Sequence, residues 1–250
     1  MPIGEIISGV LMSLATNKLE AFIDEKIPRG NKFKLWLASL KKGEMRVSVA
    51  YLYKIYVDGQ YLLIKGNRID QYQPVGGARK YYLGAGPTFR KLLVRPDDNI
   101  TIDNKSIDDL RIRIPTQNII KFLDWYETKH DREVCQQREF REELVIPGYL
   151  DKDLFATVST SYLYTVPTYH YSHHFRCWEL LYHEVYEPIF STEQLAALRA
   201  LKDSEHNELK WVKEDLIMSL GHDRQLGKKP FQIGEHARLL INSNIKLFKN

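Results

Sequence analysis

The chain has 250 residues, 44% hydrophobic and 12% aromatic, which is enough apolar material for a globular core and excludes a disordered chain. Its 36 basic and 32 acidic residues give a formal net charge of +4, which permits anionic ligands but argues against a nucleic-acid-binding protein. Two cysteines, Cys135 and Cys177, are too few for a disulfide framework and favour a reducing, cytoplasmic location.

Residues 1–45 are predicted to form a helical extension. Apolar residues from Ile3 to Ile23 recur at helical spacing. The apolar run 6–15 is about half as long as a membrane span, and Glu5 precedes it in place of a basic region, so we expect neither a span nor a secretion signal. We favour a helix packed on the body of the protein. The alternatives are a homo-oligomer formed through this helix and attachment to a membrane surface.

Strands are predicted next, over residues 46–57 and 60–66, which are rich in β-branched and aromatic residues. Asp58-Gly59 lies between them, and this dipeptide is typical of a hairpin turn because both of its residues tolerate positive φ. The stretch "QPVGG" (residues 73–77) follows, and its proline and two glycines predict a tight turn or a close approach of the backbone to another group.

Helices and strands then mix without a regular alternation, so the sequence predicts one α/β (α+β) domain behind the extension. A helix is predicted over 116–127, followed by an acidic helix over 131–145 with Asp131 as its N-cap. The remaining predictions are a strand at 110–115, strands at 156–166, 171–186 and 207–214, and helices at 191–204 and 234–245.

Three acids of the predicted acidic helix, Glu139, Glu142 and Glu143, are spaced i, i+3, i+4 and fall within an arc of roughly 100°. Like charges at this spacing repel one another. Mg²⁺ and Mn²⁺ prefer such hard oxygen ligands, and at a polyphosphate they neutralise charge and lower the pKa of bound water. Arg138 is placed to orient one carboxylate. The alternative is a solvated acidic face on which Arg138 and Arg141 pair with the acids.

The stretch "REFREEL" (residues 138–144) resembles the second half of the Nudix box, G-x5-E-x7-R-E-U-x-E-E-x-G-U, in which U is aliphatic. Phe140 stands at its first U position. The "QPVGG" stretch resembles the strand end that opens the box, and the predicted hairpin resembles the strand pair before it. The resemblance implies a Nudix-like α/β/α sandwich with a mixed sheet over residues 46–250.

The resemblance also implies roles for individual residues. Glu139, Glu142 and Glu143 would bind Mg²⁺ or Mn²⁺, and Glu139 would also act as general base. Arg138 would orient Glu139, and Gly76-Gly77 would shape the turn beside the substrate phosphates. Many Nudix enzymes add a glutamate from a later loop, for which the candidates by position are Glu184, Glu187, Glu205 and Glu208.

The sequence departs from the Nudix box in three places. Sixty residues (78–137) separate Gly77 from Arg138, far more than in the pattern, which implies an insertion at about 81–130. His130 stands where the box has its first glutamate, and the last glycine of the box is missing, since Val145 and Ile146 follow the E-E-x positions. Because histidine is a poorer ligand for a hard cation than a carboxylate, these departures weaken the expectation of catalysis more than that of the fold.

The insertion and the sequence "DDLRIRIP" resemble the diverged, SMODS-associated Nudix domains of bacterial cyclic-oligonucleotide antiphage systems (CBASS). The function this implies is Mg²⁺- or Mn²⁺-dependent hydrolysis of a phosphoanhydride in a nucleotide, in antiviral defence. One alternative is a sensor that binds a nucleotide second messenger and hydrolyses it slowly or not at all. Another is a Nudix-like scaffold without a ligand.

Histidines and aromatic residues gather in the predicted strands near residue 170, but without the spacing of a zinc site. We interpret His170, His173, His174 and His183 as ordinary strand residues. The alternative is that one of them, or Arg176, contacts a substrate phosphate. The aromatic run 162–171 offers rings on which a nucleobase could stack, although tyrosines are also common in strands.

Overall fold

The computed structural model describes residues 35–40, 42–67, 69–98, 106–223 and 225–248. The predicted helix over residues 3–23 lies outside these ranges, and the described chain begins with a short helical stretch at 35–39. Within the described ranges, no helix is long and apolar enough to cross a membrane.

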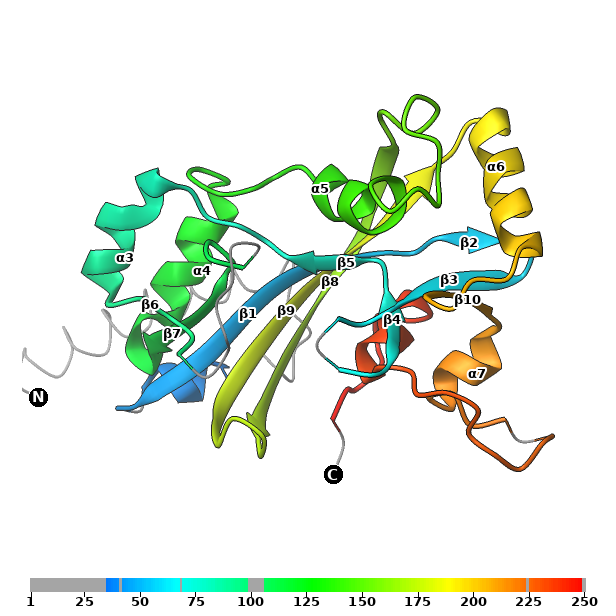
Figure 1. The fold of residues 1–250 in the computed structure, drawn as a ribbon. Helices are drawn as coiled ribbons and strands as arrows, with labels where there is room; N and C mark the ends of the chain where they lie inside the picture. The colour runs from blue at the N-terminus through cyan, green and yellow to red at the C-terminus, as the bar shows by residue number, and fades with distance from the viewer. Residues whose placement is uncertain (1–34, 41, 68, 99–105, 224, 249–250) are drawn as a thin grey trace, which may run out of the picture.

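A mixed six-stranded sheet forms the centre of the molecule (Figure 1), in the order β6-β7-β1-β9-β8, with β5 also paired to β1. The neighbours β1 and β9 run parallel, and the other pairs are antiparallel. Its strands are β1 (Glu44–Tyr53), β5 (Gly76–Ala78), β6 (Arg95–Pro96), β7 (Arg111–Pro115), β8 (Ser159–Ser172) and β9 (Cys177–Ile189).

A smaller antiparallel sheet, in the order β10-β3-β2 with β4 on β3, lies beside the first. Its strands are β2 (Tyr56–Val57), β3 (Gln60–Lys65), β4 (Tyr72–Pro74) and β10 (Leu209–Val212). The hairpin turn is confirmed, because Asp58 and Gly59 have φ values of 46° and 81°. The single strand predicted over 46–57 is wrong, since the chain leaves the first sheet after β1 and enters the second at β2.

The described helices surround the sheets. The α-helices are α3 (Gly86–Leu92), α4 (Ile119–Glu127), α5 (Gln137–Phe140), α6 (Thr192–Asp203) and α7 (Glu214–Met218). The 3-10 helices are η1 (Leu83–Ala85), η2 (Thr116–Asn118) and η4 (Glu235–Leu240), and η3 (Arg141–Val145) is a π-helix. The predicted helices at 116–127 and 191–204 are confirmed, the second with a capping box between Ser191 and Gln194. The predicted closing helix is reduced to η4.

The acidic helix begins later than the sequence predicts. Asp131 does not cap it, because this residue has a φ of 56° and α5 starts six residues further on. Residues 131–133 pair instead with residues 80–82, as the Glu133 N–H donates to the Lys80 carbonyl at 2.8 Å. Arg132 is buried with its guanidinium 3.7 Å from the centre of the Tyr126 ring. These tertiary contacts hold the segment extended against its helical propensity.

The predicted strand 171–186 also needs correction, because it contains a turn. Strand β8 ends at Ser172 and β9 begins at Cys177, so the interpretation of His173 and His174 as strand residues is wrong, because they lie in the hairpin turn. Arg176 adopts a φ of 50° there. The two histidines therefore belong to an exposed tip and not to the sheet.

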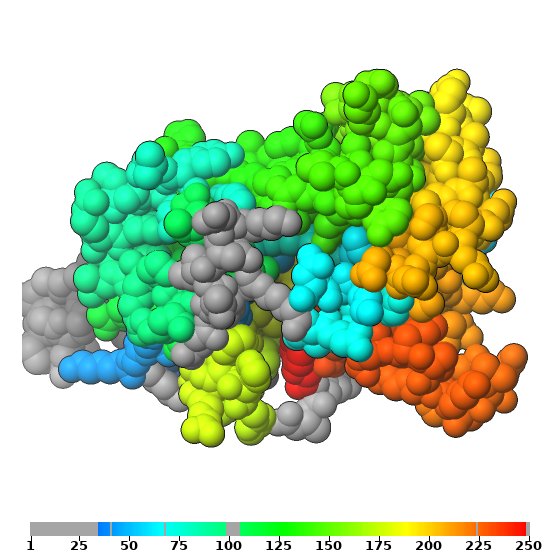
Figure 2. Space-filling model, viewed as in Figure 1, coloured from blue at the N-terminus to red at the C-terminus, as the bar shows by residue number. Residues whose placement is uncertain are grey.

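Three clusters of buried apolar side chains fix the layers. Helices α3 and α4 cover one face of the first sheet, where Phe89 and Phe122 pack near Val47 and Val49. The residues around α5 and α6 form a second cluster, and the segments that carry these two helices adjoin on the surface in Figure 2, where they are green and yellow. The C-terminal segment, with η4, forms the third cluster together with residues of both sheets. This arrangement confirms the predicted α/β (α+β) class with a mixed sheet.

Candidate functional site

The predicted glutamates lie on α5 and on the π-helical turn that continues it. Phe140 and Leu144 are fully buried in the core cluster beneath and anchor both segments. The turn closes with an i+5 bond, in which the Ile146 N–H donates to the Arg141 carbonyl at 2.7 Å. Such π-turns are rare and are frequent at functional sites. The acids thus stand on a firmly anchored but irregular piece of helix.

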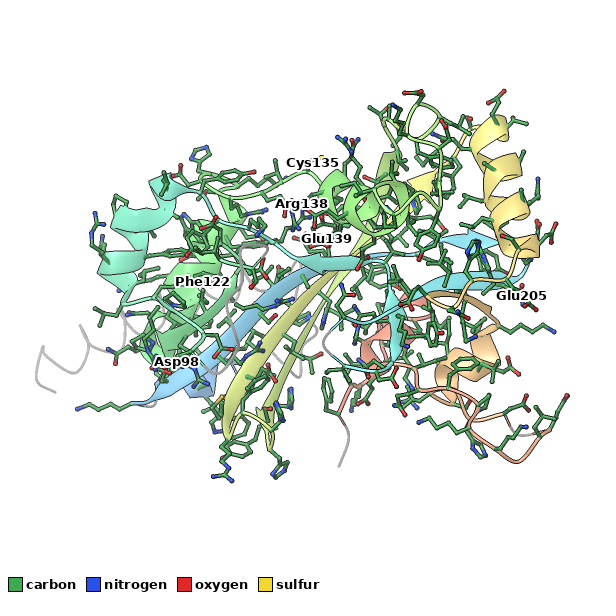
Figure 3. All side chains as sticks on the ribbon, viewed as in Figure 1. Asp98, Phe122, Cys135, Arg138, Glu139 and Glu205 are labelled. Atoms are coloured by element: carbon green, nitrogen blue, oxygen red, sulfur yellow. The ribbon has the colours of Figure 1, made fainter. Side chains whose placement is uncertain are left out.

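Arg138 is the centre of the site (Figure 3). Its guanidinium binds both carboxylate oxygens of Glu133, at 2.9 and 3.2 Å. It also donates to Glu139 Oε1 at 2.6 Å and to the Ala78 carbonyl at 2.7 Å. Glu142 Oε2 lies 3.6 Å from the same nitrogen that contacts Glu139. One cation therefore gathers three carboxylates and fastens them to the end of β5.

Glu133 is a residue of the site that sequence reasoning missed. It stands five residues before Arg138, whereas the Nudix pattern places a glutamate eight residues before it, at His130. His130 is exposed, and its N–H bonds the Thr128 hydroxyl. The extended path of residues 131–133 brings Glu133 back to Arg138, and no helical spacing predicts that path. Glu133 thus places a further carboxylate beside Arg138, from a position at which the box pattern has none.

Gly76 and Gly77 allow close approach between β5 and the acidic helix. The Gly76 N–H donates to Glu143 Oε2 at 2.9 Å, and the φ of 142° there strongly favours glycine. A Cβ at Gly76 would collide with the Tyr51 carbonyl, and one at Gly77 would collide with the Glu139 carboxylate. The close approach predicted for this stretch is confirmed.

The site concentrates negative charge. Glu133, Glu139 and Glu142 share the guanidinium of Arg138, and Glu143 is near enough to feel their charges, so these five groups carry a formal excess of three negative charges when all four acids are ionised. The pKa of Glu143 is raised to about 8, mainly by burial; the charges of Glu139 and Glu142 add to the rise, and the hydrogen bond from Gly76 opposes it. Burial also raises the pKa of Glu139.

This donor set fits a hard divalent cation, which would favour the ionised form of these buried carboxylates and relieve the repulsion among them. Glu139, Glu142 and Glu143 supply carboxylate oxygens of the kind that Mg²⁺ and Mn²⁺ prefer. In the parts of the chain that the structure describes, no three acidic, histidine or cysteine side chains already converge in a geometry that could hold a metal ion. Metal binding by these residues is therefore a matter of proposal.

The pKa of Glu143 leads to a testable pH dependence. Because its folded pKa of about 8 exceeds the unfolded value of 4.5, its contribution to stability is fully present below pH 4.5 and is lost as the pH rises through 8. Without metal, we expect the free energy of unfolding to fall by about 2 kcal/mol between pH 6.5 and 8.5 from this group. Urea unfolding in EDTA measures it. Glu143→Gln should remove the fall, the half-exposed Glu187→Gln should keep it, and equal pH slopes in all three proteins would contradict the assignment.

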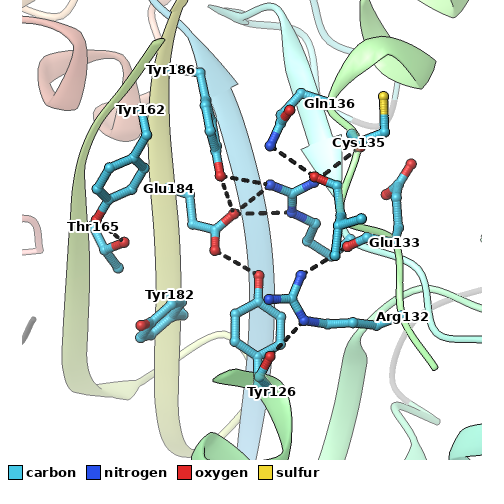
Figure 4. Close-up of polar contacts among 12 residues, drawn as sticks. Tyr126, Arg132, Glu133, Cys135, Gln136, Tyr162, Thr165, Tyr182, Glu184 and Tyr186 are labelled. Carbon is cyan, nitrogen blue, oxygen red and sulfur yellow. Dashed lines mark hydrogen bonds and ion pairs between the residues drawn. The ribbon is translucent and has the colours of Figure 1, made fainter. Parts of the chain in front are cut away.

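The later glutamates that were candidates for a further ligand lie elsewhere. Glu184, on β9, is buried, and it accepts hydrogen bonds from Arg79, Tyr126 and Tyr186 (Figure 4). The Arg79 contacts measure 2.5 and 3.0 Å, so the two groups form a buried ion pair. Figure 3 places Glu205 at the far end of the molecule from Glu139. The other two candidates, Glu187 on β9 and the exposed Glu208, have no described contact with the site glutamates.

The fold and the site together define a Nudix-type domain: a mixed sheet, a strand end with two glycines, and an R-E-F-R-E-E helix packed against it. The model of the SMODS-associated NUDIX domain matches residues 44–241. The chain belongs to this SMODS-associated NUDIX domain family, as the resemblance in the sequence predicts.

Comparison with solved structures gives a remote similarity to NrtR of Shewanella oneidensis, in a crystal structure with a 27mer DNA. The identity is 12% and the TM-score 0.30, over 80% of this chain and 59% of NrtR, so the chain spans less than two thirds of that protein. At this level the similarity supports no conclusion about ligands. Among curated proteins there is no significant match.

Proposed function

We propose that the protein is a Mg²⁺- or Mn²⁺-dependent hydrolase that cleaves a phosphoanhydride bond in a nucleotide. The observation that carries the proposal is the grouping of Glu139, Glu142 and Glu143 around Arg138, against the Gly76-Gly77 strand end. Such a group of acids has no evident structural purpose, since Arg138 compensates only part of its charge.

Each residue has a defined part in this reaction. Glu139, Glu142 and Glu143 would hold the divalent ion, which when bound supplies charge neutralisation at the phosphates. Glu139 takes the proton of the attacking water, and its pKa, raised by burial, suits a general base. The oxygen of that water forms a bond to phosphorus, and the bridging P–O bond breaks with its electrons on the leaving phosphate. Arg138 holds Glu139 in position through the 2.6 Å contact.

Glu142→Gln is the test of this proposal. The Glu142 side chain is 40% exposed, so the substitution should leave the fold intact while removing one carboxylate charge. We expect turnover of nucleotides to fall at least about 100-fold, the loss typical when a key electrostatic group is removed. Chromatography of a panel of nucleoside triphosphates, dinucleoside polyphosphates and cyclic oligonucleotides, in Mg²⁺ and in Mn²⁺, measures it. Glu187→Gln is the control, and unchanged turnover in Glu142→Gln would refute the metal assignment.

A second candidate function is a nucleotide sensor with weak or no hydrolysis. Two observations favour a site altered from the hydrolytic pattern. One guanidinium nitrogen of Arg138 contacts both Glu139 and Glu142, and His130 stands in place of a box glutamate. Membership of a SMODS-associated family supports a role in antiphage defence for either function. A nucleotide that increases oligomer size or melting temperature and is recovered intact would identify the sensor.

We also propose how the chain is divided into a domain and an extension. Residues 46–250 form the Nudix-like domain, with an insertion at about 81–130, and residues 1–45 form a helical extension, in a protein of the cytoplasm. Packing of this extension on the domain is the favoured arrangement, and association of copies through it is the alternative. The match over residues 44–241 supports the position of the domain. Size-exclusion chromatography of the full chain and of a chain without residues 1–34 would test the role of the extension.

A further inference from the structure

An exposed aromatic side chain stands at the start of the insertion, a few residues from the candidate site. Tyr82 is 54% exposed, and its neighbour Leu83 is 99% exposed. The chain reaches them from the end of β5 at Ala78, whose carbonyl accepts a hydrogen bond from Arg138. The two adjacent side chains make one exposed apolar patch, a kind of surface that a ligand or a partner can cover.

The backbone holds Tyr82 in a fixed direction. Its φ and ψ of −112° and 167° are extended, and its N–H donates to the Asp131 carbonyl at 2.8 Å. The preceding Tyr81 points inward, with its ring centre 4.9 Å from that of Phe89. Since side chains alternate along an extended chain, Tyr82 faces the opposite way, on the same side as Lys80.

Lys80, two residues before Tyr82, contacts a carboxylate of the site. Its backbone N–H lies 3.3 Å from Glu133 Oε2, and its ammonium group forms an ion pair with Asp109 at 3.2 Å. Glu133 in turn is bound by Arg138. The chain at Lys80 therefore borders the site, and Tyr82 lies two residues further out along it.

The spacing matches the anatomy of a nucleotide. An extended chain advances about 3.3 Å per residue, so the Cα of Tyr82 lies about 13 Å from the Cα of Ala78. A phosphate chain at the glutamates, followed by a ribose, brings a base across this interval to the tyrosine ring. We propose that Tyr82 is the stacking platform for the base of a nucleoside polyphosphate. The proposal rests on the proposed function, since it takes Glu139, Glu142 and Glu143 as the place of the phosphates.

The platform also predicts the substrate class. Every nucleobase has a π-face, so stacking on a single exposed ring discriminates weakly among bases. A site of this kind accepts nucleoside polyphosphates with different bases and distinguishes all of them from a polyphosphate that has no base.

The experiment compares two probes, a methylene-bridged ATP analogue and inorganic tripolyphosphate, by titration calorimetry of the full chain in Mg²⁺. Tyr82→Ala should weaken binding of the analogue about 5- to 100-fold, the loss expected when one base loses its stacking partner, and should leave tripolyphosphate binding unchanged. Tyr82→Phe keeps the ring and should bind as the wild type does. Tyr171→Ala removes a tyrosine of similar exposure, 43%, near the tip of the β8–β9 hairpin, and serves as the matched control.

Three results would overturn the platform: no binding of the analogue to the wild type, equal effects of Tyr82→Ala on both probes, or a change in oligomer size with unchanged affinity for the analogue. The last result would assign Tyr82 to a protein interface. Turnover that depends on Glu142, measured in the same preparations, separates the two proposals. Turnover with binding that does not depend on Tyr82 removes the platform alone, whereas binding that depends on Tyr82 without turnover removes hydrolysis alone.

Discussion

Arg79→Met is expected to destabilise the protein by about 3–5 kcal/mol, the cost of removing one partner from a buried ion pair. Arg79 is 1% exposed, and its guanidinium lies 4.4 Å from the centre of the Tyr51 ring while it binds Glu184. Methionine retains the volume but not the charge, so the Glu184 carboxylate is left buried with only the hydroxyls of Tyr126 and Tyr186. Urea unfolding at pH 7 measures the loss.

The matched control for this prediction is Arg199→Met. Arg199 also makes two contacts to one carboxylate, that of Asp58, at 3.0 and 3.1 Å, but its side chain is 54% exposed. Removing an exposed pair costs at most about 1 kcal/mol. In the double variant Arg79→Met/Glu184→Gln the cost should be smaller than for Arg79→Met alone, since no charge is left buried. Similar losses for Arg79→Met and Arg199→Met would show that burial of the pair has little energetic weight.

A second large effect is expected on acidification. Between pH 7.5 and 5.0 the free energy of unfolding should fall by about 4 kcal/mol through His183 and His236, about 2 kcal/mol from each. Burial lowers the pKa of His183 to about 3 and that of His236 to about 4, and the two rings lie parallel with centres 6.0 Å apart. Since the folded pKa values lie below the unfolded value of 6.5, stability is present above pH 6.5 and is lost as the pH falls toward 4.

Urea unfolding at several pH values tests this prediction through the slope of stability against pH. His183→Gln and His236→Gln should each remove about half of the fall, whatever their effect at pH 7.5. His173→Gln, in the exposed turn between β8 and β9, should leave the slope unchanged. The prediction fails when all three variants keep the slope of the wild type.

Much of the fold could be predicted from local patterns in the sequence. The Asp58-Gly59 turn and the Ser191 capping box form as their short-range chemistry requires. The break between β1 and β2 could not be predicted, because residues 46–57 have the composition of a single strand. Whether such a segment enters one sheet or two depends on which strands reach it from far along the chain, and single-sequence periodicity carries no such information.

In the site too, contacts set by local sequence could be predicted and contacts between distant segments could not. The grouping of Glu139, Glu142 and Glu143 beside Gly76-Gly77 follows from residues that are near in sequence or that belong to one pattern. Glu133 could not be predicted, because its approach to Arg138 depends on the pairing of residues 131–133 with residues 80–82. That pairing joins residues some 50 positions apart in the sequence, and local propensity cannot predict contacts over such a distance.

The long segment between the two halves of the box is part of the core of the domain. Eleven of the eighteen buried side chains in the core cluster beneath α3 and α4 come from residues 81–130, and they shield the Met45, Val47 and Val49 face of β1. The exposed loops of this segment can change length freely, but its removal would expose one side of the central sheet to water. A shorter chain with the same sheet therefore needs another cover for that face.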